Sequence, residues 1–101
     1  MEPQTLFERL WDARRIRALG PQLDLLHIDR LMLHERTGGV ALASLAERGL
    51  AVRHPSQVFA TFDHIVDTFE GRGDATLMPT GTAFITTTRR EALAAGIRLI
   101  D

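Results

Sequence analysis

The pattern of apolar positions predicts a helix near the start of the chain. Four large apolar side chains recur at helical spacing, Leu6, Phe7, Leu10 and Trp11. Thr5 precedes them and Glu8 follows three residues after Thr5, which is the arrangement of a capping box. Several arginines follow, as the negative end of a helix dipole favours, and Gly20 next to Pro21 is a typical stop. We expect a helix that begins after Thr5 and ends at Gly20.

Residues 23–33 are mostly apolar and predict two short extended segments. Three side chains of the first indicate a buried strand, Leu25, Leu26 and Ile28. The second segment covers residues 31–33. Asp29 and Arg30 interrupt the apolar run between them. These opposite charges predict either an internal ion pair or an arginine that is aimed at an anion.

Polar residues and glycines at positions 34–39 come next, and a helix is expected after them. Thr37 can cap a helix from about Gly38 to Arg48, and Gly49 suits the position just past its end. The side chains expected to face inward are Val40, Leu42, Leu45 and Ala46. A strand that leads through such a polar turn into a helix is a common place for a binding site in α/β proteins.

The last part of the chain predicts further strands and one more helix. Residues 58–66 read as a buried strand that carries Asp63 and His64 near its end. A polar loop with glycines follows. β-branched residues predict a strand over residues 83–88, and residues 89–95 predict a helix that ends at Gly96. Residues 97–100 form a final short strand.

Helices and strands therefore alternate from one end of the chain to the other. This order predicts an α/β fold, with a small, mostly parallel sheet flanked by helices. With 101 residues, the chain is expected to form a single domain over residues 1–101. It contains no internal repeat and no low-complexity segment.

Composition narrows the range of functions. The net charge is −1, so neither nucleic acid nor a membrane surface is an expected partner. All 12 basic residues are arginines, which we attribute to a GC-rich genome. Without cysteine, the chain offers no thiolate nucleophile, disulfide or iron–sulfur ligand. No signal peptide and no apolar run of membrane-spanning length is recognisable, so a cytoplasmic location is expected.

Two adjacent acid–imidazole pairs carry the candidate chemistry: His34 with Glu35, and Asp63 with His64. An aspartate can orient an imidazole, which exchanges protons near neutral pH and so can act as a general acid or base. All four side chains are also of types that bind zinc or iron, although their spacing matches no standard metal motif. Asp63 and His64 could equally cap a helix or loop. Proton transfer, metal binding and a structural role all remain open from the residues alone.

The motifs around these pairs resemble the N-terminal segment of the large subunit of 3-isopropylmalate dehydratase, in the aconitase superfamily. The resemblance covers nearly all of this chain but only a minor part of that subunit. The matching positions are residues 5–10, 28–30, 33–35, Thr37, 52–53, Pro55, 60–61, Asp63, His64, Val66, Thr68 and 95–101.

The resemblance implies a partial aconitase-type domain and a reaction. Members interconvert 2- and 3-isopropylmalate by dehydration and rehydration in leucine biosynthesis. Asp63 and His64 would be the catalytic acid–imidazole pair, and the substrate-binding residues would be His34, Arg30 and Thr37. The family uses a [4Fe–4S] cluster whose open iron binds substrate. The chain by itself would bind no cofactor or metal, so the cluster is implied for the assembled enzyme alone.

Under this interpretation the chain supplies one wall of an active site and is inactive alone. Its expected partners are the remaining large-subunit domains and the small subunit, or a second copy of the chain, together with a hydroxy-dicarboxylate substrate.

The chain also departs from the family pattern. Gly38, Gly39 and Val40 replace a typical Ser-Pro-Gln, and Ile65 replaces a typical Asn. Two further departures are Leu31 in place of His and Phe62 in place of Met. The departures at the glycines, Val40 and Ile65 favour an alternative, in which the chain is a non-catalytic relative that serves as a binding or regulatory module.

Overall fold

Residues 2–101 are described by the structure, which is a computed structural model. The N-terminal elements are a helix and an antiparallel pair of strands: α1 (Leu6–Arg14), β1 (Arg15–Gly20) and β2 (Leu23–Leu26). The remaining elements form a parallel sheet with its connections: β3 (Leu31–His34), α2 (Gly38–Glu47), the 3₁₀ turn η1 (Pro55–Gln57), β4 (Val58–Thr61), α3 (Gly81–Ala94) and β5 (Arg98–Ile100). The expected α/β fold with a mostly parallel sheet is confirmed.

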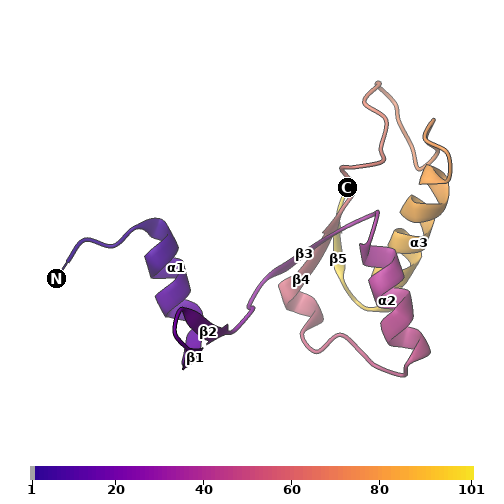
Figure 1. The fold of residues 1–101 in the computed structure, drawn as a ribbon. Helices are drawn as coiled ribbons and strands as arrows, with labels where there is room; N and C mark the ends of the chain where they lie inside the picture. The colour runs from indigo at the N-terminus through magenta and orange to yellow at the C-terminus, as the bar shows by residue number, and fades with distance from the viewer. Residues whose placement is uncertain (1) are drawn as a thin grey trace.

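The parallel sheet has the order β3-β4-β5, so strands that follow one another in the chain are neighbours. α2 connects β3 to β4, and α3 connects β4 to β5. Figure 1 shows the two helices side by side against one face of the sheet. Because the strands are parallel, their carboxyl ends meet at one edge. His34 at the end of β3 is paired in register with Thr61 at the end of β4.

The core lies between this sheet and its two helices. Its buried members are Leu42, Val58, Ala60, Ala92 and Ile97. Side chains alternate along a strand, so the neighbours of Val58 and Ala60 point to the opposite face. Within residues 2–101, no helix covers that face (Figure 1). Met32 is accordingly 57% exposed and Ile100 49% exposed.

Two glycines allow α3 to approach its surroundings closely. A Cβ on Gly39 would lie 2.8 Å from the backbone nitrogen of Thr88 and 2.9 Å from its Cα. A Cβ on Gly81 would lie 2.5 Å from Cγ2 of Ile65. These distances are too short for a larger residue unless the neighbouring atoms shift. Gly39 therefore allows α2 and α3 to approach closely, and Gly81 allows the start of α3 to pack against Ile65.

α1 and the β1–β2 hairpin form a separate N-terminal unit. The indole N–H of Trp11 donates to the carboxylate of Asp24 at 2.6 Å, and Arg14 pairs with Asp29 at 3.0 Å. Figure 1 shows this unit beside the sheet rather than on it. The radius of gyration is 17.5 Å, compared with about 13 Å for a compact 100-residue domain. The chain is therefore elongated, and α1 has no buried residue.

Two predictions for the N-terminal unit are wrong. The first helix ends at Arg14 rather than at Gly20, because Arg15 turns to an extended conformation and starts β1. The pairing of β1 with β2 replaces helical hydrogen bonds there. The strand at residues 23–28 is not buried: β2 stops at Leu26, and Ile28 is 69% exposed beyond it.

The strand predicted over residues 83–88 is also wrong, because this segment belongs to α3. Its buried side chains follow a helical interval, Gly81, Ile85, Thr88 and Ala92. Packing of this face against the sheet outweighs the β propensity of threonine and isoleucine. Of the predicted strand at residues 58–66, only the part within β4 is a strand.

The second helix lies where it was predicted, but only part of its inward face is correct. Leu42 is buried and Leu45 half-buried, as expected. Val40 is 59% exposed and Ala46 is exposed, because α2 is covered only on the side that meets β3 and α3.

Predictions from local chemistry are confirmed. Thr5 and Glu8 form the capping box, with the Glu8 N–H donating to Thr5 Oγ1 at 3.2 Å. Gly49 and Gly96 follow their helices with φ of 67° and 73°, the left-handed conformation that ends helices. Thr37 occupies the N-cap position of α2, without a side-chain capping hydrogen bond.

Replacing Gly39 by Ala should destabilise the fold by about 1–3 kcal/mol, because the added methyl group meets the α3 backbone rather than a flexible side chain. Chemical denaturation followed by circular dichroism measures the change. Gly73→Ala is the matched control, since a Cβ there meets nothing within 4 Å, and it should stay within about 0.5 kcal/mol. Equal stability of the two variants would contradict the close approach.

Candidate functional site

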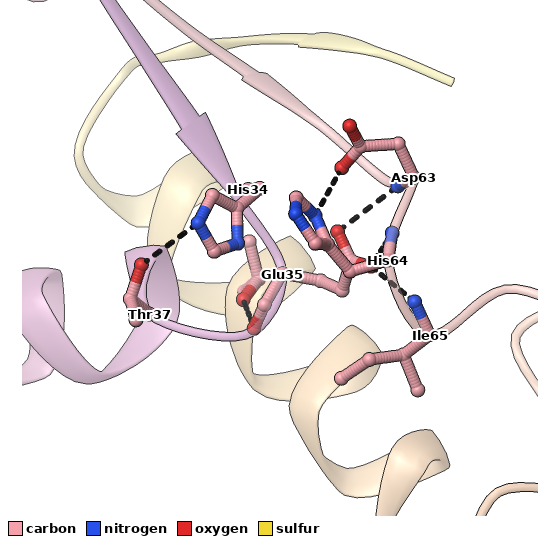
Figure 2. A network of polar contacts seen from close by, with 7 residues as sticks. His34, Glu35, Thr37, Asp63, His64 and Ile65 are labelled. Atoms are coloured by element: carbon pink, nitrogen blue, oxygen red, sulfur yellow. Dashed lines mark hydrogen bonds and ion pairs between the residues drawn. The ribbon is translucent and has the colours of Figure 1, made fainter.

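The buried carboxylate of Glu35 organises the edge of the sheet where β3 and β4 end. Glu35 follows β3 directly and is 1% exposed. Oε2 accepts a hydrogen bond from the backbone N–H of Asp63 at 3.0 Å, and Oε1 accepts from those of His64 and Ile65. Figure 2 shows this carboxylate beside the segment after β4, with dashed lines to its backbone nitrogens. One side chain therefore fixes three consecutive residues of that segment.

Burial and hydrogen bonding act in opposite directions on the pKa of Glu35. Burial is the largest effect and raises the pKa by disfavouring the charged form. The backbone N–H groups of Glu35 itself, Asp63, Ile65 and His64 together outweigh burial and lower the pKa below its ordinary value. The carboxylate is therefore ionised at neutral pH.

Two imidazoles lie beside this carboxylate, each with a nitrogen within 4.8 Å of one of its oxygens. The ring centroids of His34 and His64 are 4.1 Å apart, with 35° between the ring planes. Nδ1 of His64 lies 2.7 Å from Oδ1 of Asp63, and Nε2 of His34 lies 3.4 Å from the hydroxyl of Thr37. In Figure 2 the other nitrogen of each ring points toward the space between the rings.

The structure thus brings four of the five predicted site residues together, which are Asp63, His64, His34 and Thr37. Arg30 is not among them. It precedes β3, whereas His34 ends that strand, and the four residue steps from Arg30 to His34 span about 13 Å of extended chain. Arg30 instead lines a cavity of about 370 Å³ at the opposite edge of the sheet, with His27, Arg53 and His54. Asp29 pairs with Arg14 and not with Arg30.

The sequence identifies Glu35 as a candidate beside His34, but it does not reveal the bonds of Glu35 to residues 63–65, which have no local signal. The sequence does not point to Thr88 at all. The Thr88 hydroxyl donates to the backbone carbonyl of Glu35 at 3.0 Å and accepts from the Gly39 N–H at 3.1 Å. It was assigned to a strand, which hid its place on the buried face of α3.

Similarity to curated proteins is consistent along the chain. 3-isopropylmalate dehydratase large subunit 1 of Bradyrhizobium diazoefficiens is 40% identical over 98 residues, which are 97% of this chain and 20% of that protein. The large subunit of Akkermansia muciniphila is 36% identical over 98 residues, 97% of this chain and 21% of that protein. The large subunit of Thermus thermophilus is 43% identical over 67 residues, 66% of this chain and 14% of that protein.

The chain is a homologue of one segment of the 3-isopropylmalate dehydratase large subunit. The chain spans about a fifth of the length of the first two relatives. No protein-family model and no solved structure matches it.

Two departures from the large-subunit pattern are explained by packing. Ile65 is 3% exposed and packs against Gly81, where an asparagine would need hydrogen-bond partners. Gly39 lies against the backbone of Thr88, where a larger residue would not fit without a shift of that backbone. Ile65 therefore packs on the start of α3, and Gly39 serves the contact between α2 and α3.

The side chains present do not fit the [4Fe–4S] cluster that the dehydratase family implies. Such clusters are held by cysteine thiolates, and the chain contains no cysteine.

Among the described residues, no helix is both long and apolar enough to cross a membrane.

Replacing Glu35 by Gln should destabilise the chain by about 1.5–3 kcal/mol at neutral pH, because hydrogen bonds to a charged acceptor are lost. In this variant the free energy of unfolding should also depend less on pH in the acidic range. The pKa of Glu35 is lowered by folding, so its contribution is complete above the ordinary glutamate pKa of about 4.3 and is lost as the pH falls through the lower folded value.

Urea denaturation from pH 7 to pH 3 compares wild type with Glu35→Gln and with the control Glu47→Gln, which alters an exposed carboxylate on α2. The control should stay within about 0.5 kcal/mol of wild type. Parallel curves for wild type and Glu35→Gln would contradict the role of this carboxylate.

Proposed function

We propose that the chain supplies one wall of the active site of a 3-isopropylmalate dehydratase-like hydro-lyase, with Asp63 and His64 as its acid–imidazole pair. The observation that carries this proposal is the 2.7 Å contact between Oδ1 of Asp63 and Nδ1 of His64. It lies in the segment that aligns with the dehydratase large subunits. It also lies at the carboxyl edge of a parallel sheet, where α/β proteins usually bind ligands.

The proposed chemistry assigns one proton transfer to this pair. Asp63 holds Nδ1 of the imidazole and stabilises its positive charge, while Nε2 gives a proton to the hydroxyl that leaves the substrate as water. Addition of water in the reverse direction returns the proton to Nε2. His34 and Thr37 would line the substrate pocket beside it. The assignment of Arg30 to substrate binding remains a prediction. It requires a substrate that contacts both edges of the sheet, because Arg30 and His34 lie at opposite edges.

The iron–sulfur cluster of the family would be held by cysteines outside this chain. When present, it would supply a Lewis acid for the substrate hydroxyl. The residues of this chain would contribute the pocket wall and the proton, so the chain alone is expected to have no dehydratase activity.

The proposed partner is the remainder of a large subunit, together with a small subunit. Two uncovered apolar surfaces support this. Parallel sheets are almost always covered on both faces, yet here one face is open. α1 likewise exposes Leu6, Phe7 and Leu10 at 73%, 66% and 49%. Missing domains of the relatives' large subunits would cover such surfaces.

The catalytic proposal is tested by complementation. A relative's large subunit without its matching segment is mixed with its small subunit and with this chain, and turnover of 3-isopropylmalate is measured. His64→Ala should lower kcat by about 10²–10⁴-fold, the usual contribution of a general acid. Asp63→Asn should lower kcat in the same direction, because the amide cannot stabilise an imidazolium.

His54→Ala is the matched control, since His54 lies at the other edge of the sheet, and it should not change kcat. Unchanged turnover in His64→Ala would contradict a catalytic role for Asp63 and His64 and would leave them a structural role only. Turnover by the isolated chain would contradict the proposal that it needs partners.

The docking proposal is tested on α1. Phe7→Asp should weaken binding to the truncated large subunit by more than about tenfold, because burial of such a side chain contributes about 1.5–3 kcal/mol. Isothermal titration calorimetry measures the affinity. Arg9→Asp also places an aspartate on the exposed surface of α1 and changes the net charge by one unit more, yet it should change the affinity less. Equal losses in the two variants would contradict docking through the apolar residues.

A second candidate function is a non-catalytic binding or regulatory module. The burial of Ile65, directly beside His64, favours it, because the polar side chain typical of the family is absent from the site. In the complementation assay this alternative predicts binding to the truncated subunit without any restored turnover.

A further inference from the structure

The charge of Glu35 is buried without a cationic side chain to balance it. Within residues 2–101, no arginine or histidine side chain forms an ion pair with this carboxylate. Its partners are backbone N–H groups. Buried charges in proteins are usually paired with an opposite charge or bound to a metal ion. A cation bound beside Glu35 would balance this charge.

The imidazoles beside Glu35 have nitrogen atoms that are free to bind a cation. Nδ1 of His34 is buried and has no hydrogen-bond partner. Nδ1 of His64 is occupied by Asp63, which leaves Nε2 of that ring. In Figure 2 these two nitrogens face the space between the rings. One ligand atom each from His34, Glu35 and His64 lie within 4.8 Å of one another.

We propose that His34, Glu35 and His64 bind one divalent transition-metal ion of the zinc type. Two imidazoles and one carboxylate, with a position left for water, are a common ligand set for zinc. Imidazole also suits iron and nickel. This inference does not rest on the proposed function, because it concerns the chain without partners. An ion bound to Nε2 of His64 would exclude the proton transfer proposed for that atom, so the two roles belong to different states of the site.

The surrounding contacts suit the proposed ion. A carboxylate that binds the second nitrogen of a ligating histidine fixes the ring and strengthens it as a ligand, and Asp63 is so placed on His64. Thr37 lies near the second nitrogen of His34 in the same way. Of the two Glu35 oxygens, Oε1 accepts two backbone hydrogen bonds from residues 63–65 and Oε2 accepts one, so Oε2 is the oxygen better placed to bind an ion.

Metal binding requires only a small closure of the site. Ligand atoms about 2.0–2.1 Å from a tetrahedral zinc ion lie about 3.3 Å from each other. The three groups, within 4.8 Å of one another, therefore need to approach by about 1.5 Å at most. The side chain of His64 is 50% exposed and can turn without displacing buried neighbours.

The test uses the purified 101-residue chain, treated with chelator and free of any affinity tag. Calorimetric titration with Zn²⁺ at neutral pH should give one ion per chain, and Co²⁺ should develop a visible d–d absorption band that Zn²⁺ displaces. His34→Ala and His64→Ala should each weaken Zn²⁺ binding by more than about 100-fold. Asp63→Asn should weaken it by about 10–100-fold, the usual effect of losing a partner of a metal ligand.

The chain provides a matched control in its other two histidines. The double variant His27→Ala/His54→Ala, altered at the opposite edge of the sheet, should bind Zn²⁺ like wild type. Nitrogen NMR of the wild-type imidazoles should show Zn²⁺-dependent shifts at His34 and His64, which keeps the test valid if an alanine variant fails to fold.

Three results would overturn the proposal: binding of less than one ion per chain, full affinity in a folded His34 or His64 variant, or loss of binding in the control. None of them bears on the complementation assay, so failure of the metal site and failure of the proposed function are distinguishable.

Discussion

The hydrogen bonds from the backbone of residues 63–65 to the buried carboxylate of Glu35 are the interaction on which the site depends. They join the end of β3 to the segment after β4. Because they hold backbone groups, they set where Asp63 and His64 project, whatever those side chains do. The same bonds keep a negative charge stable inside the protein, and that charge lies within 4.8 Å of a nitrogen of each imidazole.

Close packing by α3 supports this arrangement from below. Thr88 bonds both the Glu35 carbonyl and the Gly39 amide, so α3, α2 and the end of β3 meet at one buried hydroxyl. Arg89, the next residue, pairs with Asp74 at 2.7 Å and Asp101 at 2.8 Å and lies over the ring of Phe62. The segment that carries the acid–imidazole pair is thereby fixed at Phe62 and again at residues 63–65.

The exposed surfaces suit a chain that belongs with other domains. Its homologous large subunits are about five times longer, since the chain covers 20% and 21% of them. One face of the parallel sheet and the apolar face of α1 are open. The site lies at the edge of the open face, because His34 alternates with Leu33 and so points away from the core. A partner that covers this face would also close the site.

The sequence by itself determined the features that depend on near neighbours. The capping box at Thr5, the glycines that end α2 and α3, and the alternation of helices with parallel strands all follow from local chemistry and order. The acid–imidazole residues could also be named in advance. The switch from α1 to β1 at Arg15 and the helical state of residues 83–88 could not, because pairing and packing with distant residues decide them. Only the tertiary structure placed Glu35 under residues 63–65, 28–30 positions away, and moved Arg30 to the other edge. Contacts over such separations leave no periodic trace in a sequence, since they depend on how whole strands and helices come together.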